Sequence, residues 1–290
     1  MGTLHVVATP IGNLEDLSPR ARRVLAEVAL IAAEDTRRTG FLLRHFGITT
    51  PMISYHAHNE RERRERLLAA LTEGDVALVS DAGTPGISDP GNDLVAAAHA
   101  AGFPVSPVPG ASSLAAAVSA SGLVPGPFVV IGFLPRERGP RALAIGRAAA
   151  AGLPLVVFEA PTRVAATLTD LNEALGPRAA VVLRELTKLH EEVRPGSLAD
   201  LAAWAETDGL RGEVVIVVGA ATQEVDPPSG DDIPALVATL RRSGLSASAA
   251  AREAAAITGR PRSEMYEVAR AWSPPSGAGG DEADQEGRLR

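Results

Sequence analysis

The sequence predicts an α/β protein with two α/β lobes followed by a small helical module. Short apolar runs rich in Val and Ile alternate with segments of ten or more residues that show helical periodicity. This alternation is typical of largely parallel sheets covered by helices, and stretches rich in Pro and Gly at residues 121–127 and 225–231 indicate linkers. The expected parts are an N-terminal α/β lobe at 1–121, a C-terminal α/β lobe at 122–224, a helical module at 231–272 and a disordered tail at 273–290.

Each expected strand is a short, mostly apolar run that ends near Gly, Pro or polar residues. Between the runs, segments such as Glu60–Leu71 gather Leu67, Leu68 and Leu71 on one helical face. The expected strands are Leu4–Ala8, Ala29–Ala33, Met52–Tyr55, Val76–Ser80, Val105–Val108, Phe128–Phe133, Leu155–Glu159, Ala180–Arg184 and Glu213–Val218.

Composition limits the classes of protein and partner. Hydrophobic residues make up 46% of the 290 residues and aromatic residues only 3%, so Ala, Val, Leu and Ile fill the core. We expect no membrane span, because no apolar run approaches the roughly 20 residues that one needs. The first residues lack the segments of a signal peptide, so we expect a cytoplasmic protein. Without cysteine we expect no disulfide, and we expect no metal site.

The net charge of −7 is unusual for a protein that binds nucleic acid. Such proteins are usually basic, because neutralisation of phosphates supplies much of their affinity. If this chain binds RNA, it must therefore do so through a local basic patch.

Three loops that follow expected strands are candidates for a ligand site, because open α/β sheets bind ligands at the carboxyl ends of their strands. Thr9–Leu14 contains a glycine but matches neither a dinucleotide fingerprint nor a P-loop. Ser80–Gly91 holds glycines that permit close approach of a ligand, together with Asp81. Pro109–Ala117 places small residues at the start of a helix. Ordinary turns, helix caps and tight packing are the simpler interpretations of the same residues.

Polar residues after two other expected strands suit acid–base work or substrate binding. Glu34, Asp35 and Arg37 follow one strand, and His56 and Asn59 follow the next. Helix capping by Asp35 and a solvated charged surface are the alternatives. The run Arg61–Arg66 is able to contact RNA phosphates, although Glu–Arg pairs at helical spacing more often form a solvated face.

The order of these loops resembles that of the 16S rRNA cytidine-2′-O-methyltransferases, which have the tetrapyrrole-methylase fold. The resemblance covers about residues 4–220 in one register. It implies two α/β lobes with S-adenosyl-L-methionine in the cleft between them, and usually a homodimer. The matching segments are Thr9–Leu14, Ala33–Arg37, Ser80–Pro85, Pro109–Ser113, Phe158–Pro161, Arg184–Lys188 and Gly212–Glu213.

The resemblance also assigns roles to residues of this sequence. The cofactor-binding residues it implies are Pro10, Ile11, Gly12, Asp81, Ala82, Gly83, Thr84, Pro85, Gly110, Ala111, Ser112, Ser113, Glu159, Ala160, Gly212 and Glu213. Arg37, His56 and Asn59 belong to the substrate side, with Arg61 as a nearby basic residue. A ribose hydroxyl is a poor nucleophile near neutral pH, so we hypothesise that Lys188, Asp35 or Glu34 takes or stabilises its proton.

The implied substrate is a cytidine in the decoding region of 16S rRNA, methylated within the small ribosomal subunit. Two other functions fit parts of the sequence. An acidic chain suits a methyltransferase that acts on a precorrin-like tetrapyrrole, although the Ala33–Arg37 segment and the helical module argue against it. A non-catalytic RNA-binding protein that senses the cofactor is the third possibility.

Overall fold

The computed structural model describes residues 1–221, 233–242 and 244–272. The chain divides into two compact units, residues 1–222 and 223–290. The expected linker at 225–231 and the expected disordered tail at 273–290 lie outside the described residues. None of the helices in the described ranges is long and apolar enough to cross a membrane.

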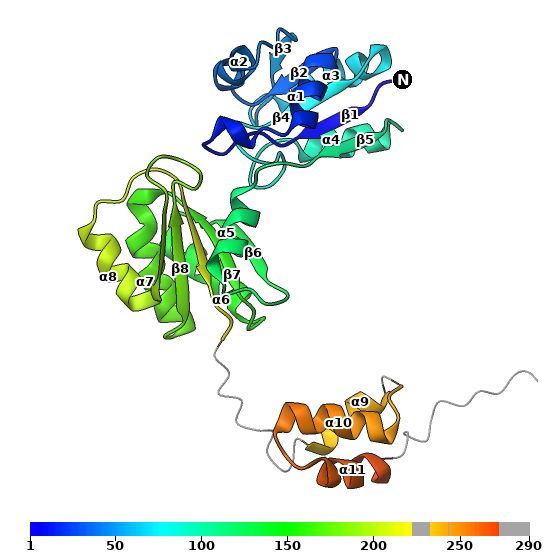
Figure 1. The fold of residues 1–290 in the computed structure, drawn as a ribbon, viewed down its shortest axis with the longest axis vertical. Coiled ribbons are helices and arrows are strands. Elements are labelled where there is room, and N and C mark those ends of the chain that lie inside the picture. The colour runs from blue at the N-terminus through cyan, green and yellow to red at the C-terminus, as the bar shows by residue number, and fades with distance from the viewer. Residues whose placement is uncertain (222–232, 243, 273–290) are drawn as a thin grey trace, which may run out of the picture. The chain divides into compact units, whose positions relative to one another are not determined.

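The first sheet is entirely parallel, as the sequence predicts (Figure 1). Its strands lie in the order β3-β2-β4-β1-β5, so that β1 and β4 are central. Parallel strands present their carboxyl ends at one edge of the sheet, and the loops after β1, β2 and β4 therefore emerge together. The strands are β1 (Leu4–Val7), β2 (Leu30–Ala33), β3 (Met52–Ser54), β4 (Val76–Val79) and β5 (Val105–Val108).

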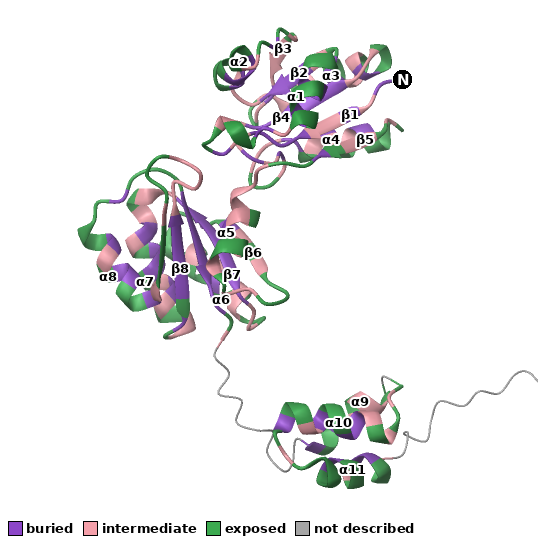
Figure 2. Ribbon diagram, in the orientation of Figure 1, coloured by how far each residue is buried: buried purple, intermediate pink, exposed green. Residues whose placement is uncertain are grey.

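Apolar clusters cover both faces of this sheet, which explains why its central strands read as continuous apolar runs. Figure 2 shows buried residues along the strands and exposed residues on the outer sides of the helices. Helix α1 illustrates the local signals: Ser18 caps it, Pro19 occupies its first position, and Val24 and Leu25 are buried. The helices are α1 (Pro19–Glu27), α2 (Thr36–His45), α3 (Glu60–Glu73) and α4 (Asn92–Ala100), with a 3-10 turn at Leu14–Asp16.

The second sheet is mostly antiparallel, so the expectation of largely parallel sheets is wrong for this lobe. Only β6 and β7 are parallel, because β10 runs against both of its neighbours in the order β6-β7-β10-β8-β9. Two strands that are joined through a helix can run parallel or antiparallel in a sheet. The alternation of strands and helices in the sequence therefore did not determine the direction of the strands. The strands are β6 (Val129–Phe133), β7 (Leu155–Glu159), β8 (Ala179–Arg184), β9 (Glu192–Ser197) and β10 (Val214–Val218).

Strand β9 was not expected from the sequence. It contains Pro195 and Gly196 and only one large apolar residue, Val193. Because β9 pairs with β8 alone, at the edge of the sheet, it tolerates a proline that a central strand would not.

Helices cover both faces of the second sheet. Residues of α6, α7 and α8 share one apolar cluster with the strands, whereas Ala117 of α5 packs on the opposite face beside Val156 and Val181. Helix α5 was expected in the N-terminal lobe 1–121, but it packs on the second sheet. We therefore propose that the lobe boundary lies before α5 rather than at residue 121. These helices are α5 (Ser113–Ser121), α6 (Arg138–Ala149), α7 (Val164–Leu175) and α8 (Leu198–Thr207), with a 3-10 turn at Pro161–Arg163.

The described part of the C-terminal unit is helical, as the sequence predicts. Its helices are α9 (Ile233–Arg242), α10 (Ala247–Thr258) and α11 (Arg262–Ala271). They share an apolar core that includes Ile233, Val237, Ala254 and Met265. The bounds 231–272 of this module stay a prediction.

Candidate active site

An inner cavity of about 380 Å³ lies where loops of both lobes meet. This volume falls within the roughly 300–1,000 Å³ of sites for small molecules and cofactors. The first lobe contributes the loop after β4, and α5 contributes its first turn. The residues of the second lobe that line the cavity are Phe133, Phe158, Glu159, Ala160, Pro161, Leu183, Leu186, Gly212, Glu213, Val214 and Val215.

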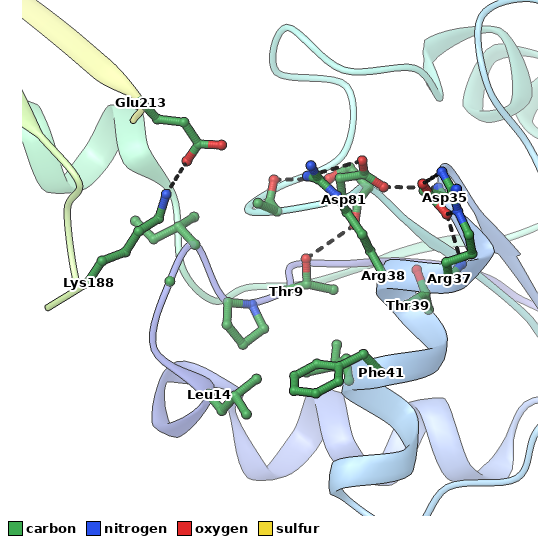
Figure 3. A pocket seen from close by; sticks show the side chains of 16 residues that line it. Thr9, Leu14, Asp35, Arg37, Arg38, Thr39, Phe41, Asp81, Lys188 and Glu213 are labelled. Atoms are coloured by element: carbon green, nitrogen blue, oxygen red, sulfur yellow. Dashed lines mark hydrogen bonds and ion pairs between the residues drawn. The ribbon is translucent and has the colours of Figure 1, made fainter. Parts of the chain in front are cut away.

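An outer cleft of about 530 Å³ adjoins the inner cavity. It is lined by the loop after β1, the first half of α2, Lys188 and Glu213. Figure 3 shows that Lys188 points toward Glu213 and that the side chains of α2 lie on the other side of the cleft. The two hollows share five lining residues and are therefore adjacent. These shared residues are Ile11, Arg38, Asp81, Ala82 and Glu213.

The predicted cofactor residues divide among the two hollows and their surroundings. Pro10 and Gly12 line the outer cleft, and Pro85, Gly110 and Ala111 line neither hollow. Those that line the inner cavity are Ile11, Asp81, Ala82, Gly83, Thr84, Ser112, Ser113, Glu159, Ala160, Gly212 and Glu213.

The three candidate loops of the first lobe are bonded to one another. Thr9 and Gly83 exchange two backbone hydrogen bonds, of 2.8 and 3.0 Å, and the Thr84 hydroxyl donates to the carbonyl of Ala111 at 3.2 Å. The loops are therefore fixed relative to each other and form a rigid wall of the cavity.

Asp35 is the N-cap of α2 and accepts a hydrogen bond from the backbone N–H of Arg37 at 2.8 Å. The Arg37 guanidinium also pairs with this carboxylate at 2.7 Å. These hydrogen bonds hold the pKa of Asp35 well below its usual range. Asp35 therefore begins a helix and is a weak base, so the capping alternative accounts for its position.

The side-chain carboxylates of Glu34 and Asp81 link the loops after β2 and β4, because each accepts a hydrogen bond from a backbone N–H of the other loop. The N–H of Asp81 donates to Glu34 Oε2 at 3.1 Å, and the N–H of Asp35 donates to Asp81 Oδ1 at 2.9 Å. Arg38 pairs with the second oxygen of Asp81 at 3.4 Å. Burial raises the pKa of Glu34, and the charge of Asp81 adds to this effect although the Asp81 N–H opposes it.

Lys188 extends from the loop after β8 toward the first lobe. Its Nζ donates to Glu185 Oε1 at 2.8 Å and to Glu213 Oε2 at 3.0 Å. Burial alone lowers the pKa of Lys188, but the two carboxylates outweigh it and raise the pKa. The loop adopts positive φ angles at Glu185 (50°) and Thr187 (67°), which non-glycine residues rarely adopt. A strained loop thus holds an ammonium group at the outer cleft.

Glycine is required at two positions beside this loop. A Cβ on Gly12 would overlap Cγ of Lys188 and lie 2.8 Å from Oγ1 of Thr187. Gly212 has a φ of +84°, and a Cβ there would overlap the Glu185 carboxylate. Both glycines therefore permit close approach of protein to protein, whereas the resemblance implied that they bind the cofactor.

Glu159 lines the inner cavity, but both of its carboxylate oxygens already have partners. The backbone N–H of Ala160 donates to Oε1 at 2.8 Å, and the Thr167 hydroxyl donates to Oε2 at 2.7 Å. Arg163 lies 3.3 Å from the same Oε2. This buried carboxylate fixes the turn after β7 and has little capacity left for a ligand.

The predicted substrate residues His56, Asn59 and Arg61 line neither hollow. The Asn59 side chain accepts from the N–H of His56 at 2.8 Å and donates to the carbonyl of Ser54 at 3.2 Å. These bonds form the turn that leads into α3, where Arg61 is exposed. The structure thus gives these residues a local role and does not bring them to the cleft with Arg37.

Sequence reasoning missed Phe41, Arg38 and Glu185 as site residues. Phe41 lines the outer cleft and is 61% exposed, which is unusual for phenylalanine. Its spacing of four residues from Arg37 on one helix is a signal that could have identified it. Glu185 gave no signal, because its charge is equally typical of an exposed loop.

The chain matches known proteins over most of its length. The family profile described as Tetrapyrrole (Corrin/Porphyrin) Methylases matches residues 3–202. A protein of Synechocystis named ribosomal RNA small subunit methyltransferase I is 48% identical over 271 residues, covering 92% of this chain and 97% of that protein. A protein of the same name from Xylella fastidiosa is 50% identical, covering 91% of this chain and 98% of that protein.

Solved structures share the fold at low sequence identity. The methyltransferase CobJ has a TM-score of 0.59 at 21% identity, with 76% of this chain and 95% of CobJ covered. A uroporphyrin-III C-methyl transferase from Thermus thermophilus, solved with S-adenyl homocysteine, has a TM-score of 0.52 at 20% identity, with 76% and 97% covered. The predicted fold class is confirmed, and this chain belongs to the tetrapyrrole methylases and, within them, to the ribosomal RNA small subunit methyltransferase I family.

Proposed function

We propose that this protein uses S-adenosyl-L-methionine to methylate the ribose 2′-hydroxyl of a decoding-region cytidine in 16S rRNA of the small ribosomal subunit. The adjacency of the inner cavity and the outer cleft carries the proposal, because it provides adjoining sites for a small cofactor and a large substrate. The names of the relatives support ribosomal RNA over a tetrapyrrole as the substrate.

The inner cavity fits a cationic nucleoside cofactor. Glu34, Asp81, Asp89 and Glu213 line it, with Arg38 as a basic neighbour. Burial, together with the charges of the other three carboxylates, raises the pKa of Asp89 to about 6. This excess of negative charge suits a sulfonium and an ammonium group. When bound, S-adenosyl-L-methionine supplies an electrophilic methyl group.

Of the three candidates for handling the hydroxyl proton, Lys188 has the most suitable position. Glu34 lines the inner cavity and not the outer cleft, and Asp35 is a weak base. The Lys188 ammonium lies at the outer cleft beside Glu213, which lines both hollows. In our proposal Lys188 stabilises the negative charge that develops on the ribose oxygen as the hydroxyl proton passes to solvent water and the oxygen takes the methyl group.

The far side of the outer cleft suits an unstacked nucleotide. Arg37 and Phe41 lie one helical turn apart on α2, and Arg38 reaches the wall that the two hollows share. Proteins recognise single-stranded RNA by stacking bases on aromatic rings and by pairing phosphates with arginine. We propose that Phe41 stacks on a base and that Arg37 contacts a phosphate, in place of His56 and Asn59.

We also propose that the protein acts as a homodimer in the cytoplasm, where its substrate is assembled. Phe128 and Val130 are 38% and 41% exposed on or beside β6, which is an edge strand. A second copy of the chain would cover these apolar side chains and the unpaired strand edge.

Tritiated methyl transfer to small subunits from a strain that lacks the gene tests the proposed function. Label in 16S rRNA, mapped by mass spectrometry to the 2′-oxygen of one cytidine, is the expected result. Label in a tetrapyrrole would establish the rival enzyme. Cofactor binding without any transfer would establish a non-catalytic sensor.

A further inference from the structure

The helical module is basic although the whole chain is acidic. Residues 233–272 contain six Arg and three Glu, a net charge of +3, whereas the chain has a net charge of −7. The rest of the chain therefore carries −10. Because such a charge repels RNA at long range, a protein that binds a ribosomal subunit benefits from a basic surface elsewhere.

The charges of helix α11 are separated onto different sides. Arg262, Tyr266 and Arg270 follow each other at intervals of four residues, so they form one stripe along the helix. All three are exposed, whereas Met265 faces the core. Glu264 lies on the other flank of the exposed face, and Glu267 lies between that flank and the stripe, three residues before Arg270.

The two arginines of the stripe have no carboxylate partner among the described residues. Arg262 donates to the neutral hydroxyl of Ser248 on α10 at 2.9 Å. Arg270 makes no hydrogen bond or ion pair with any residue in the described ranges. By contrast, Arg260, which lies outside the stripe, pairs with Glu264 at 2.7 Å. The positive charge of the stripe is therefore available to an external partner.

The stripe stands on a rigid support. Helix α11 packs against α10, and the Thr258 hydroxyl of α10 contacts the sulfur of Met265 at 3.7 Å. The turn between the two helices is short, because Gly259 ends α10 in the left-handed conformation and α11 begins at Arg262. Side chains fixed in this way lose less entropy when they bind.

We propose that the stripe Arg262–Tyr266–Arg270 is a docking surface for ribosomal RNA. This inference rests on the proposed function and adds a second contact to it, distinct from the outer cleft. The two arginines lie about 12 Å apart along the helix at 1.5 Å per residue, so they contact separate phosphates. Tyr266, which is 40% exposed, stacks on an unpaired base between them.

Binding of the full-length protein to small subunits, measured over a series of salt concentrations, tests this surface. Arg262→Gln combined with Arg270→Gln should reduce the slope of log K against log salt by about two, and weaken binding roughly tenfold or more near 0.1 M salt. Arg262→Lys combined with Arg270→Lys keeps the charge and should keep the slope. Thermal melting and calorimetry with S-adenosyl-L-methionine should not change in either variant.

Arg22→Gln combined with Arg23→Gln is the matched control, since it removes the same charge from an exposed surface of α1. Equal salt slopes for this control and the Gln variant of the stripe would overturn the docking surface. So would weaker binding to an acidic ribosomal protein with unchanged binding to the RNA. If the wild-type protein methylates no RNA at all, the proposed function fails, which is a separate result.

Discussion

Replacement of Gly12 by Ala tests whether the first lobe holds Lys188 in its working position. The new methyl group would overlap Cγ of Lys188 and lie 2.8 Å from Oγ1 of Thr187. Carbon atoms in contact need about 3.5 Å. The overlap with the carbon Cγ of Lys188 therefore requires a shift on the order of 1 Å, and Oγ1 of Thr187 must also give way.

The structure has two ways to absorb this shift. If the backbone yields, overpacking costs about 1–3 kcal/mol of stability. If Lys188 moves instead, it loses its bonds to Glu185 and Glu213, each worth about 1.5–3 kcal/mol as a bond to a charged group. A misplacement of roughly 1 Å at a reacting centre lowers a rate about 100-fold. We therefore expect a rate loss near 100-fold with a stability loss of at most about 3 kcal/mol.

Single-turnover methylation of small subunits and urea unfolding measure the two effects separately. Gly146→Ala is the control, because a Cβ there meets no atom within 4 Å. It lies inside α6, so this change should stabilise the protein by about 0.5–1 kcal/mol and leave the rate unaltered. A Gly12→Ala enzyme with the wild-type rate would refute the idea that the contact between Gly12 and Lys188 holds the lysine in position for catalysis.

Three further changes test other parts of the site. Lys188→Met should lower the single-turnover rate by about 100- to 1,000-fold, as loss of a charge-stabilising group does, while calorimetry still detects cofactor binding. Phe41→Ala should raise KM for the RNA about tenfold through loss of stacking, with kcat and the melting temperature unchanged because the ring is 61% exposed. The pKa of Asp89, about 6 when folded and 3.8 as the ordinary value, means that the folded state holds the proton more tightly. Ionised Asp89 therefore destabilises the folded state at pH 7, and this effect is lost as pH falls toward 4. Asp89→Asn should be more stable than wild type at pH 7 in urea unfolding, and the difference between the two should disappear toward pH 4.

The fold was predictable where burial alone determines the pattern. Val76–Val79 is buried on both faces, so it reads as a continuous apolar run and matches β4 within one residue of the expected strand. Strand direction in the second lobe was not predictable, because it depends on which strands pair and not on the residues within each strand. Likewise, nothing in the sequence around Ala117 indicates that this residue packs on the second sheet and not on the first.

The location of the site was more predictable than the roles of its residues. Loops such as Asp81–Thr84 follow strands, and parallel topology brings them to one edge. The partner of each polar group depends on tertiary contacts instead. Glu159 was expected to bind the cofactor, but both of its carboxylate oxygens already have protein partners. Glu185 was assigned no role, but it holds Lys188.

Glu213, which was expected to bind the cofactor, links the two hollows to Lys188. Its carboxylate lines both the inner cavity and the outer cleft, and it binds the ammonium of Lys188 at 3.0 Å. Its backbone N–H donates to Glu185 at 3.0 Å, so the two carboxylate partners of the lysine are bonded to each other. A change of charge in the inner cavity therefore alters the electrostatic potential at Glu213. Through Glu213 it alters the strength of the ion pairs that Glu185 and Glu213 form with Lys188. Through this arrangement, the binding of a cationic cofactor in the inner cavity would change the ion pairing of Lys188.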